Sequence, residues 1–310
     1  MKILVTGGCG YKGSVLVPKL LDKGYLVTVV DAMWFGNFLK GHPNLIVIKG
    51  DIRQTSDEWL YDTDVVIHLA SVANDPCADL DPKLSWETSA LGTMLLADKA
   101  VKYGVKQFIY ASSGSVYGVS DAPQVIEDTP LLPISEYNKA KMVAERVLLS
   151  YANEMTIQIV RPATVCGYSP RMRLDVSVNM LTMQALTKGL ITVFGGEQTR
   201  PNIHIDDITD LYLYLLEKEM PGTFNAGFEN ISILDIAKLV KQYVPADIKV
   251  TTSNDPRSYR LNSDKLLNTG FRPKKTVNDA IQELIAQYKA AKLADDDRFY
   301  NIRTMKAIAL

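Results

Sequence analysis

Tyr137 and Lys141 stand four positions apart in the stretch SEYNKAK, residues 135–141. On a helix, positions i and i+4 lie on one face, so the phenol and the ammonium group can point at the same place. The pair is a candidate acid–base unit of an enzyme. Tyr-x-x-x-Lys also arises often by chance on exposed helices, so the pair needs support from other residues.

The stretch TGGCGYKGS, residues 6–14, contains two overlapping glycine patterns, Gly-x-Gly-x-x-Gly and Gly-x-x-Gly-x-x-Gly. Glycines at a tight strand-to-helix turn let the backbone approach a pyrophosphate closely, and the helix N-terminus offers N–H groups to the phosphates. We therefore predict a dinucleotide-binding turn. Its cofactor-binding residues are Gly7, Gly10, Tyr11, Lys12 and Gly13.

Asp31 ends the next apolar run and stands 18 residues beyond Gly13. A carboxylate at this place accepts hydrogen bonds from the adenosine ribose hydroxyls and repels the extra phosphate of NADP. No Arg or Lys lies between residues 31 and 39 to bind that phosphate. The sequence therefore favours NAD over NADP.

Small or polar residues follow the later strands of the predicted sheet. Ligands of an open parallel sheet bind beyond the carboxyl ends of its strands. We expect Asp51 to reach adenine, and Ala70 and Ser71 to pass close to the pyrophosphate or ribose. These strand ends add the following residues to the predicted cofactor site: Asp51, Ile52, Leu69, Ala70, Ser71 and Pro162.

Ser113 follows the fifth predicted strand and completes a possible catalytic unit. A free tyrosine has a pKa of about 10, which is too high for a base at neutral pH. A neighbouring lysine cation and a cationic nicotinamide both favour the phenolate. We predict that Tyr137 is the base or acid, that Lys141 tunes it and holds the nicotinamide ribose, and that Ser113 positions the reacting oxygen of the substrate.

The elements that must position these residues follow a simple alternation. Continuous apolar strands separated by helices predict a doubly wound α/β domain, a Rossmann fold with a parallel sheet covered on both faces. The predicted strands are KILVT (2–6), YLVTVV (25–30), LIVI (45–48), DVVIHLA (64–70), QFIYA (107–111) and TIQIVR (156–161). The predicted helices cover about 12–23, 83–103 and 137–153.

After residue 161 this alternation changes. Segment 167–199 is irregular, and helical patterns recur around 206–219, 232–243 and 276–292. These patterns predict the following division: a Rossmann domain over 1–164 that is rejoined by about 200–220, a smaller C-terminal α/β substrate domain from 165–199 and 221–293, and a tail, 294–310. The tail opens with three aspartates, and we assign it no function.

The composition of the 310 residues is that of an ordinary globular protein, with 47% hydrophobic and 22% charged residues. A formal net charge of -1 gives no global field toward nucleic acid or acidic lipid. The three cysteines are scattered and the three histidines have no metal-ligand spacing with them, which predicts a reducing compartment and no metal site. No apolar run reaches membrane-spanning length. We expect a cytoplasmic protein without nucleic-acid or membrane partners.

The ordered motifs resemble the extended short-chain dehydrogenase/reductase family, in its nucleotide-sugar epimerase and dehydratase branch. The resemblance covers nearly the whole chain, and its motifs are TGGCGYKGS, Asp31, GDIR (50–53), HLAS (68–71), SSGSVYG (112–118), YNKAK (137–141) and RPATVCG (161–167). It implies NAD as cofactor and a nucleoside-diphosphate sugar as substrate, and it favours the catalytic reading of Tyr137 and Lys141.

The resemblance also implies residues that bind the substrate. Besides Ser113, these are Asn179, expected at the nucleotide, and Arg200 and Arg257, expected at the diphosphate. Arginine suits that task because its planar fork donates two hydrogen bonds to phosphate oxygens. Two further arginines in SPRMRLD, residues 169–175, can also face the substrate, but the resemblance does not assign their roles.

Three departures from the family pattern bear on the reaction. Dehydratases of this branch carry an Asp-Glu pair where this chain has Gly114 and Ser115, so 4,6-dehydration is not expected. A tyrosine common after the sixth strand is Cys166, which we interpret as a pocket or core residue. An asparagine often found near the nicotinamide is Ser89.

The resemblance favours an NAD-dependent 4-epimerase that oxidises a sugar hydroxyl, turns the 4-keto sugar over and returns the hydride. One alternative is a one-way C4 dehydrogenase or 4-ketosugar reductase that uses the same residues. Another is a dinucleotide-sensing protein without catalysis, although such proteins usually lack the Tyr-Lys pair. The resemblance also implies a homodimer packed through the helices at about 83–103 and 137–153.

Overall fold

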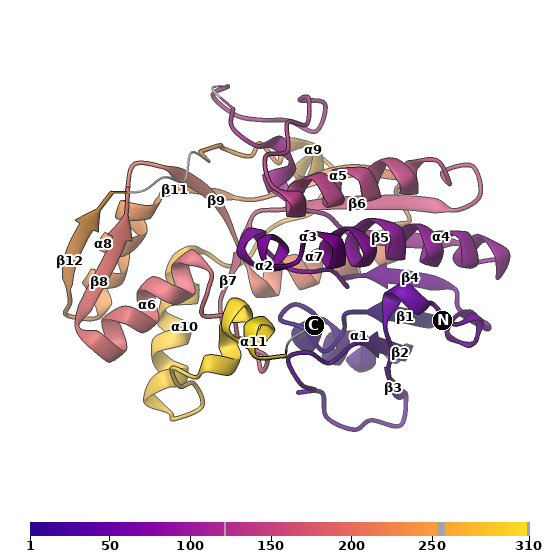
Figure 1. Ribbon diagram of the computed structural model, residues 1–310, viewed down its shortest axis with the longest axis horizontal. Coiled ribbons are helices and arrows are strands. Elements are labelled where there is room, and N and C mark those ends of the chain that lie inside the picture. Colours follow the sequence, from indigo (N-terminus) through magenta and orange to yellow (C-terminus); the bar gives the residue numbers. More distant parts are fainter. Residues whose placement is uncertain (121, 253–257, 309–310) are drawn as a thin grey trace.

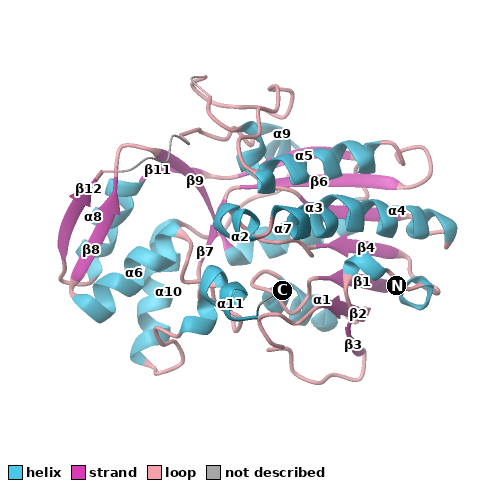
Figure 2. Ribbon diagram, viewed as in Figure 1, coloured by secondary structure: helices cyan, strands magenta, loops and turns pink. Residues whose placement is uncertain are grey.

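A seven-stranded parallel sheet forms the larger part of the molecule, on the right of Figures 1 and 2. The computed structural model describes residues 1–120, 122–252 and 258–308. The strand order is β10-β6-β5-β4-β1-β2-β3. The strands are β1 (Lys2–Thr6), β2 (Leu26–Asp31), β3 (Leu45–Lys49), β4 (Val65–His68), β5 (Gln107–Ala111), β6 (Thr156–Pro162) and β10 (Gly222–Ala226). This arrangement confirms the predicted doubly wound α/β fold.

Helices cover both faces of this sheet because successive side chains of each strand point to opposite sides. In β1, Ile3 and Val5 belong to the hydrophobic cluster that includes residues of α1 and α7, whereas Leu4 belongs to the cluster of α4 and α5. The helices of this part are α1 (Gly13–Asp22), α2 (Asp75–Leu80), α3 (Pro82–Trp86), α4 (Gly92–Lys102), α5 (Glu136–Leu149), α7 (Ile205–Lys218) and α9 (Asp264–Asn268).

The smaller part, on the left of Figure 1, has two small sheets of order β11-β9-β7 and β12-β8. Its strands are β7 (Thr164–Cys166), β8 (Leu190–Phe194), β9 (Thr199–His204), β11 (Glu229–Ser232) and β12 (Asp247–Thr251). Its helices are α6 (Ser177–Lys188), α8 (Ile233–Tyr243) and α10 (Val277–Lys289). Side chains of these helices and of β8 form its core.

The prediction that segment 167–199 is irregular is wrong, because it contains α6 and β8. The reason lies in the sequence of α6, SVNMLTMQALTK, which buries polar as well as apolar side chains. Asn179 and Thr182 are fully buried beside Leu181. Their polarity blurs the apolar stripe from which a helix is recognised.

The return of the chain to the large sheet extends further than the predicted limit near residue 220. β10 pairs in parallel with β6, from Gly222 opposite Gln158 to Ala226 opposite Pro162. α7 carries the chain across one face, and β10 then adds a strand at the edge. Residues 222–226 therefore belong to the large sheet and not, as predicted, to the smaller part.

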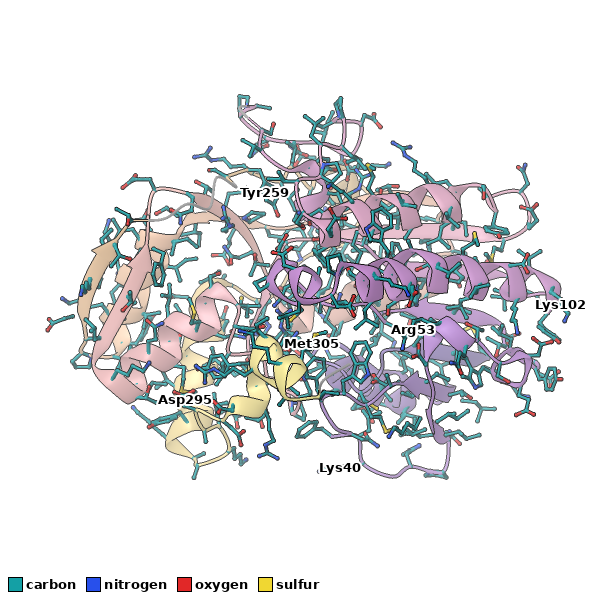
Figure 3. The ribbon with its side chains drawn as sticks, viewed as in Figure 1. Lys40, Arg53, Lys102, Tyr259, Asp295 and Met305 are labelled. Carbon is teal, nitrogen blue, oxygen red and sulfur yellow. The ribbon has the colours of Figure 1, made fainter. Side chains whose placement is uncertain are left out.

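The C-terminal tail forms a short turn, η5 (Asp297–Phe299), and helix α11 (Asn301–Ile308). In Figure 3, Met305 lies on this helix near the middle of the molecule, between the two parts, while Asp295 lies at the lower edge. Met305 is buried against Val72, Cys77 and Ala78. The tail is therefore packed against the region of α2.

Candidate active site

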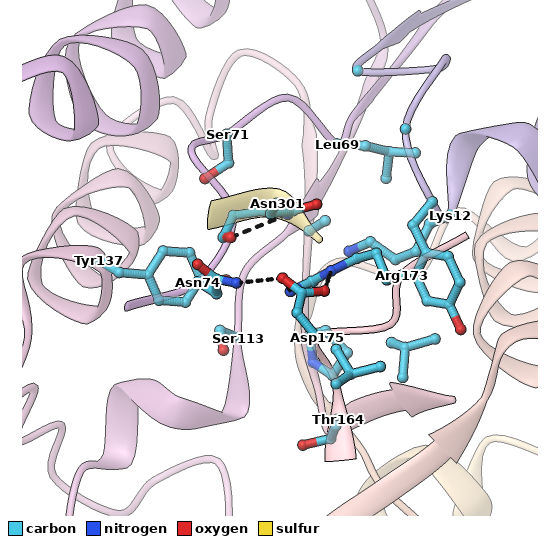
Figure 4. A pocket seen from close by; sticks show the side chains of 18 of the residues that line it. Lys12, Leu69, Ser71, Asn74, Ser113, Tyr137, Thr164, Arg173, Asp175 and Asn301 are labelled. Carbon is cyan, nitrogen blue, oxygen red and sulfur yellow. Dashed lines mark hydrogen bonds and ion pairs between the residues drawn. The ribbon is translucent and has the colours of Figure 1, made fainter. Parts of the chain in front are cut away.

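A cavity of about 600 Å³ opens at the carboxyl ends of the parallel strands, between the two parts. Ser113 and Arg200, both predicted to bind substrate, line it. Figure 4 shows Lys12, Ser71, Ser113 and Tyr137 around this space. Every predicted cofactor-binding residue lines the cavity: Gly7, Gly10, Tyr11, Lys12, Gly13, Asp31, Asp51, Ile52, Leu69, Ala70, Ser71, Tyr137, Lys141 and Pro162.

The glycine turn has the shape required to receive a phosphate group. Gly7 has φ +71°, and a Cβ added there would lie 2.6 Å from the backbone nitrogen of Ala70. A Cβ added at Gly13 would overlap the carbonyl of Gly8, whereas one at Gly10 would meet only the Gly7 carbonyl oxygen, at 3.2 Å. The turn is thus packed closely on the protein side and open toward the cavity, as a dinucleotide requires.

Asp31 fixes the turn to the end of β2. Its carboxylate accepts hydrogen bonds from the backbone N–H of Cys9 at 2.9 Å and of Met33 at 2.7 Å. Burial raises the pKa of this carboxyl despite these two donors. A carboxylate has about four acceptor positions. Asp31 can therefore still accept the predicted hydrogen bonds from the ribose hydroxyls.

Asp51 is held by a bidentate ion pair with Arg53. Arg53 Nε and Nη2 lie 2.9 and 2.6 Å from Asp51 Oδ2. Burial opposes ionisation of Asp51, but the hydrogen bonds from Arg53 hold its pKa below the ordinary value. Asp51 is thus a charged residue of fixed orientation at the edge of the cavity.

Helix α5 places Tyr137 and Lys141 on one face, as the spacing predicted. Ser135 caps the helix by accepting the N–H of Asn138 at 3.2 Å, which puts Tyr137 in the first turn. Lys141 Nζ donates to the carbonyl of Ala111 at the end of β5, at 2.8 Å, and lies 6.0 Å from the centre of the Tyr137 ring. The helix and the strand end therefore meet at this pair.

The surroundings of Tyr137 keep its phenol protonated in the protein alone. Burial and the charge of Asp75 raise its pKa to about 12, while a hydrogen bond with Ser113 and the charge of Arg173 lower it. Burial and Lys12 hold the pKa of Lys141 well below its ordinary value. Arg173 is thus a cation that acts on Tyr137, a role that the sequence left unassigned.

Ser113 is oriented by a short chain of hydroxyl and amide groups. Its Oγ lies 2.7 Å from Ser115 Oγ and accepts the backbone N–H of Ser115. The Ser115 hydroxyl in turn donates to Asn138 Oδ1. Asn138 lies in the first turn of α5, next to Tyr137, so the serine and the tyrosine share one support. The motif comparison had not identified Asn138.

Ser89 is a buried residue of a π-helical turn, η3 (Glu87–Leu91), between α3 and α4. Its hydroxyl lies 2.9 Å from that of Ser71, a predicted cofactor-binding residue. Single π turns inside helices occur frequently at functional sites. The replacement of the family's asparagine by Ser89 therefore affects the predicted cofactor site through Ser71.

The predicted role of Asn179 at the nucleotide is not supported by its position. Asn179 does not line the cavity; its Oδ1 accepts the N–H of Gly167 at 3.0 Å, and its Nδ2 donates to Tyr11 Oη at 3.1 Å and to the Arg173 carbonyl at 2.9 Å. The fully buried amide instead ties α6 to the glycine turn. Arg257 lies outside the described residues.

A partly buried cluster of polar side chains that sequence reasoning missed stands at the centre of Figure 4. Arg173 Nε donates to Asp175 Oδ1 at 2.9 Å, and Asn74 Nδ2 donates to Asp175 Oδ2 at 2.9 Å. All three residues line the cavity. The pair of arginines in SPRMRLD was the only sequence signal of this cluster. The contact of Asn74 with Asp175 could not be predicted, because these residues are 101 positions apart.

Cys166 is fully buried, and burial raises the pKa of its thiol, in agreement with its interpretation as a core residue. Across residues 1–120, 122–252 and 258–308, no group of three or more His, Cys, Asp or Glu side chains is placed to hold a metal ion. Within these same ranges, no helix has both the length and the apolar character to cross a bilayer.

Comparison with known proteins gives consistent similarities. The model of the NAD dependent epimerase/dehydratase family matches residues 3–227. A UDP-glucuronic acid decarboxylase of Xenopus tropicalis is 28% identical over 309 residues, which cover 93% of this chain and 72% of that protein. A UDP-glucose 4-epimerase of Lactobacillus helveticus is 27% identical over 335 residues, which cover 96% of this chain and 100% of that protein.

A similar solved structure is that of a UDP-glucuronic acid 4-epimerase from Bacillus cereus in complex with UDP-glucuronic acid and NAD. It aligns with a TM-score of 0.83 and 27% identity over 94% of this chain and 100% of that chain. The similar proteins thus include enzymes named for different reactions.

Proposed function

Since the chain belongs to the NAD-dependent epimerase/dehydratase family and uses NAD as its cofactor, we propose that it is a nucleotide-sugar epimerase that acts through a 4-keto sugar. The observation that carries the proposal is the convergence of Ser113, Tyr137 and Lys141 on one cavity. The same cavity is lined by the glycine turn and by Arg200, so it has groups suited to a dinucleotide and to a sugar diphosphate.

Bound NAD supplies a hydride acceptor and donor whose positive charge favours the tyrosine phenolate. Tyr137 takes the proton of the C4 hydroxyl as the hydride leaves C4, and Ser113 holds the same oxygen by a hydrogen bond. Lys141 Nζ, 6.0 Å from the centre of the Tyr137 ring, places a cation next to the phenol when it is protonated. For the return step, in which the reduced cofactor would supply the hydride to the other face of the keto sugar, Tyr137 gives the proton back to the C4 oxygen.

The structure around Gly114 disfavours the 4,6-dehydratase reaction, for which members of the branch carry carboxylates at the positions of Gly114 and Ser115. A Cβ at Gly114 would lie 3.0 Å from Leu261 Cδ1 and 3.1 Å from the Pro162 carbonyl oxygen, so a larger side chain meets close neighbours. The Ser115 hydroxyl is already bonded within the Ser113 chain. Neither position offers an acid for the elimination of water.

We also propose that two copies pair through α4 and α5. Leu91, the last residue of η3, and Met94, in the first turn of α4, are 43% and 40% exposed. Apolar side chains of this size on adjacent helical turns are suited to burial in a subunit interface. A cytoplasmic location remains a prediction from the scattered cysteines.

The test is incubation of the purified protein with UDP-, GDP-, CDP- and dTDP-sugars, with NMR of the products and the absorbance of NADH. An epimer without accumulated NADH supports the proposal. A released ketosugar with stoichiometric NADH would indicate the one-way dehydrogenase, and a pentose with CO₂ would indicate decarboxylation; either result overturns it. Tyr137→Phe protein is the matched control.

A further inference from the structure

Arg171, in the loop between β7 and α6, is a buried cation on the wall of the cavity. It is only 2% exposed, and its guanidinium carbon lies 4.0 Å from the centre of the Phe35 ring. Among the described residues, no carboxylate forms an ion pair with Arg171, and its Nε has no hydrogen-bond partner. A buried charge is costly unless it is paired, so this guanidinium is suited to an anion that enters the cavity.

The loop that carries Arg171 is fastened to the glycine turn. Ser169 Oγ donates to the Tyr11 carbonyl at 2.8 Å, and Tyr11 Oη donates to the Gly167 carbonyl at 2.7 Å. The charges of Asp175 and of Asp31, the latter at the end of β2, also act on Arg171. These contacts place Arg171 on the dinucleotide side of the cavity, near the turn that is open to phosphate.

The C-terminal tail holds Arg171 in this position. Asn301 is 1% exposed, and its Oδ1 accepts the hydrogen bond of Arg171 Nη2 at 2.6 Å. Its Nδ2 reaches the Ala73 carbonyl at 3.4 Å, and the backbone of the tail is joined to the Arg171 loop where Leu174 N–H donates to the Phe299 carbonyl at 2.8 Å. Asn301 lines the same cavity as Lys12 and Tyr137 (Figure 4).

We propose that Arg171 binds the diphosphate of NAD and that the C-terminal tail, through Asn301, holds Arg171 in place and thereby retains the cofactor. Three segments far apart in the sequence then converge on one anion: the turn after β1, the loop after β7 and the tail. Burial and Arg173 lower the pKa of Arg171 to about 10, so it remains a cation at neutral pH. The role does not depend on which sugar reaction the enzyme performs.

The first test measures the affinity of NAD-stripped Arg171→Gln protein for NAD, ADP-ribose, adenosine and UDP. Loss of a charge-assisted hydrogen bond to phosphate should weaken NAD and ADP-ribose about 10- to 100-fold. Adenosine and UDP should change less than about twofold, since neither would contact Arg171. The NAD affinity of Arg171→Lys, which keeps the charge, should lie between that of the wild type and that of Arg171→Gln.

Three results would overturn the proposal: unchanged NAD affinity, an equal loss for adenosine, or a loss for UDP with NAD unaffected. The last result would assign Arg171 to the substrate diphosphate. Circular dichroism must first show that the variant is folded. If Arg171→Gln does not fold, the tail variant described next decides.

The second test compares Asn301→Ala with Lys306→Ala, an exposed position on the same helix. The fraction of NAD that remains after gel filtration and the rate of NAD release are measured for each protein. Release should be about 3- to 10-fold faster in Asn301→Ala, which loses one hydrogen bond to Arg171, and unchanged in Lys306→Ala. Wild-type retention of NAD by folded Asn301→Ala would show that the tail does not hold the cofactor.

Discussion

Tyr137 lies between Asp75, whose charge raises the pKa of the phenol, and Arg173, whose charge lowers it. Asp75→Asn removes the raising influence and keeps the shape of the side chain. The phenol pKa should then fall, and the acidic limb of the pH profile of kcat/KM, on which activity rises as Tyr137 loses its proton, should move to lower pH. Asp79→Asn, an exposed position on the same helix, should leave the profile unchanged. A profile that does not move, or moves to higher pH, would contradict this account of the phenol.

Removal of the phenol hydroxyl tests the catalytic unit itself. Tyr137→Phe should lower kcat by about 10²- to 10⁴-fold, the usual contribution of a positioned acid or base. The protein should keep its NAD, because the glycine turn and Asp31 are untouched. The matched control is Tyr61→Phe, since Tyr61 is 57% exposed and remote from the cavity. Full activity of Tyr137→Phe would favour the non-catalytic reading of the chain.

At the scale of elements, α5 is joined to β6 by a buried ion pair. Arg161 Nη2 lies 2.7 Å from Glu145 Oε2, and the two side chains are 6% and 2% exposed. Glu145→Gln leaves the arginine buried without its charge partner. The free energy of unfolding, measured by urea denaturation, should therefore fall by about 3–5 kcal/mol. Lys238→Gln breaks an exposed pair and should show no measurable loss. Equal stability of the two variants would contradict the importance of the buried pair.

The turn before α1 has no room for a side chain at Gly13. Gly13→Ala should force the Gly8 carbonyl to move and destabilise the protein by about 1–3 kcal/mol. NAD should then raise the melting temperature less than it does in the wild type. Gly41→Ala is the control, because a Cβ there has no neighbour within 4 Å. An unchanged thermal unfolding curve for Gly13→Ala would show that the turn is less tightly packed.

Elements with local signals were predicted well. The parallel sheet follows from apolar runs, the glycine turn from its spacing, and the meeting of Tyr137 with Lys141 from the helical period. The parts that were missed depend on contacts between distant positions: β10 joins β6, and Asn301 meets Arg171 across 130 positions. The hydrogen bonds of the π turn at Ser89 span one residue more than those of an α-helix, a difference that no periodicity of the sequence reveals.

At the scale of the whole molecule, the proposed pairing of two copies can be measured directly. Sedimentation should give about twice the chain mass of 34.4 kDa. Met94→Asp places a charge on the exposed face of α4 and should shift the equilibrium toward the single chain, because an unpaired charge is costly in an apolar interface. Ile46→Asp, at the other edge of the sheet, is the control, since Ile46 is 61% exposed. A single-chain mass for the wild type would refute the proposed dimer.

The late arrival of β10 has a consequence for synthesis on the ribosome. Strand β6 is complete at Pro162, but its partner β10 ends only at Ala226. Until that segment leaves the exit tunnel, the nascent chain carries an open strand edge, and the sheet face that α7 covers is bare as well. Open edges of this kind invite pairing with a neighbouring chain. The dinucleotide half therefore cannot complete its sheet until the segment through Ala226 has emerged, well after β6 itself.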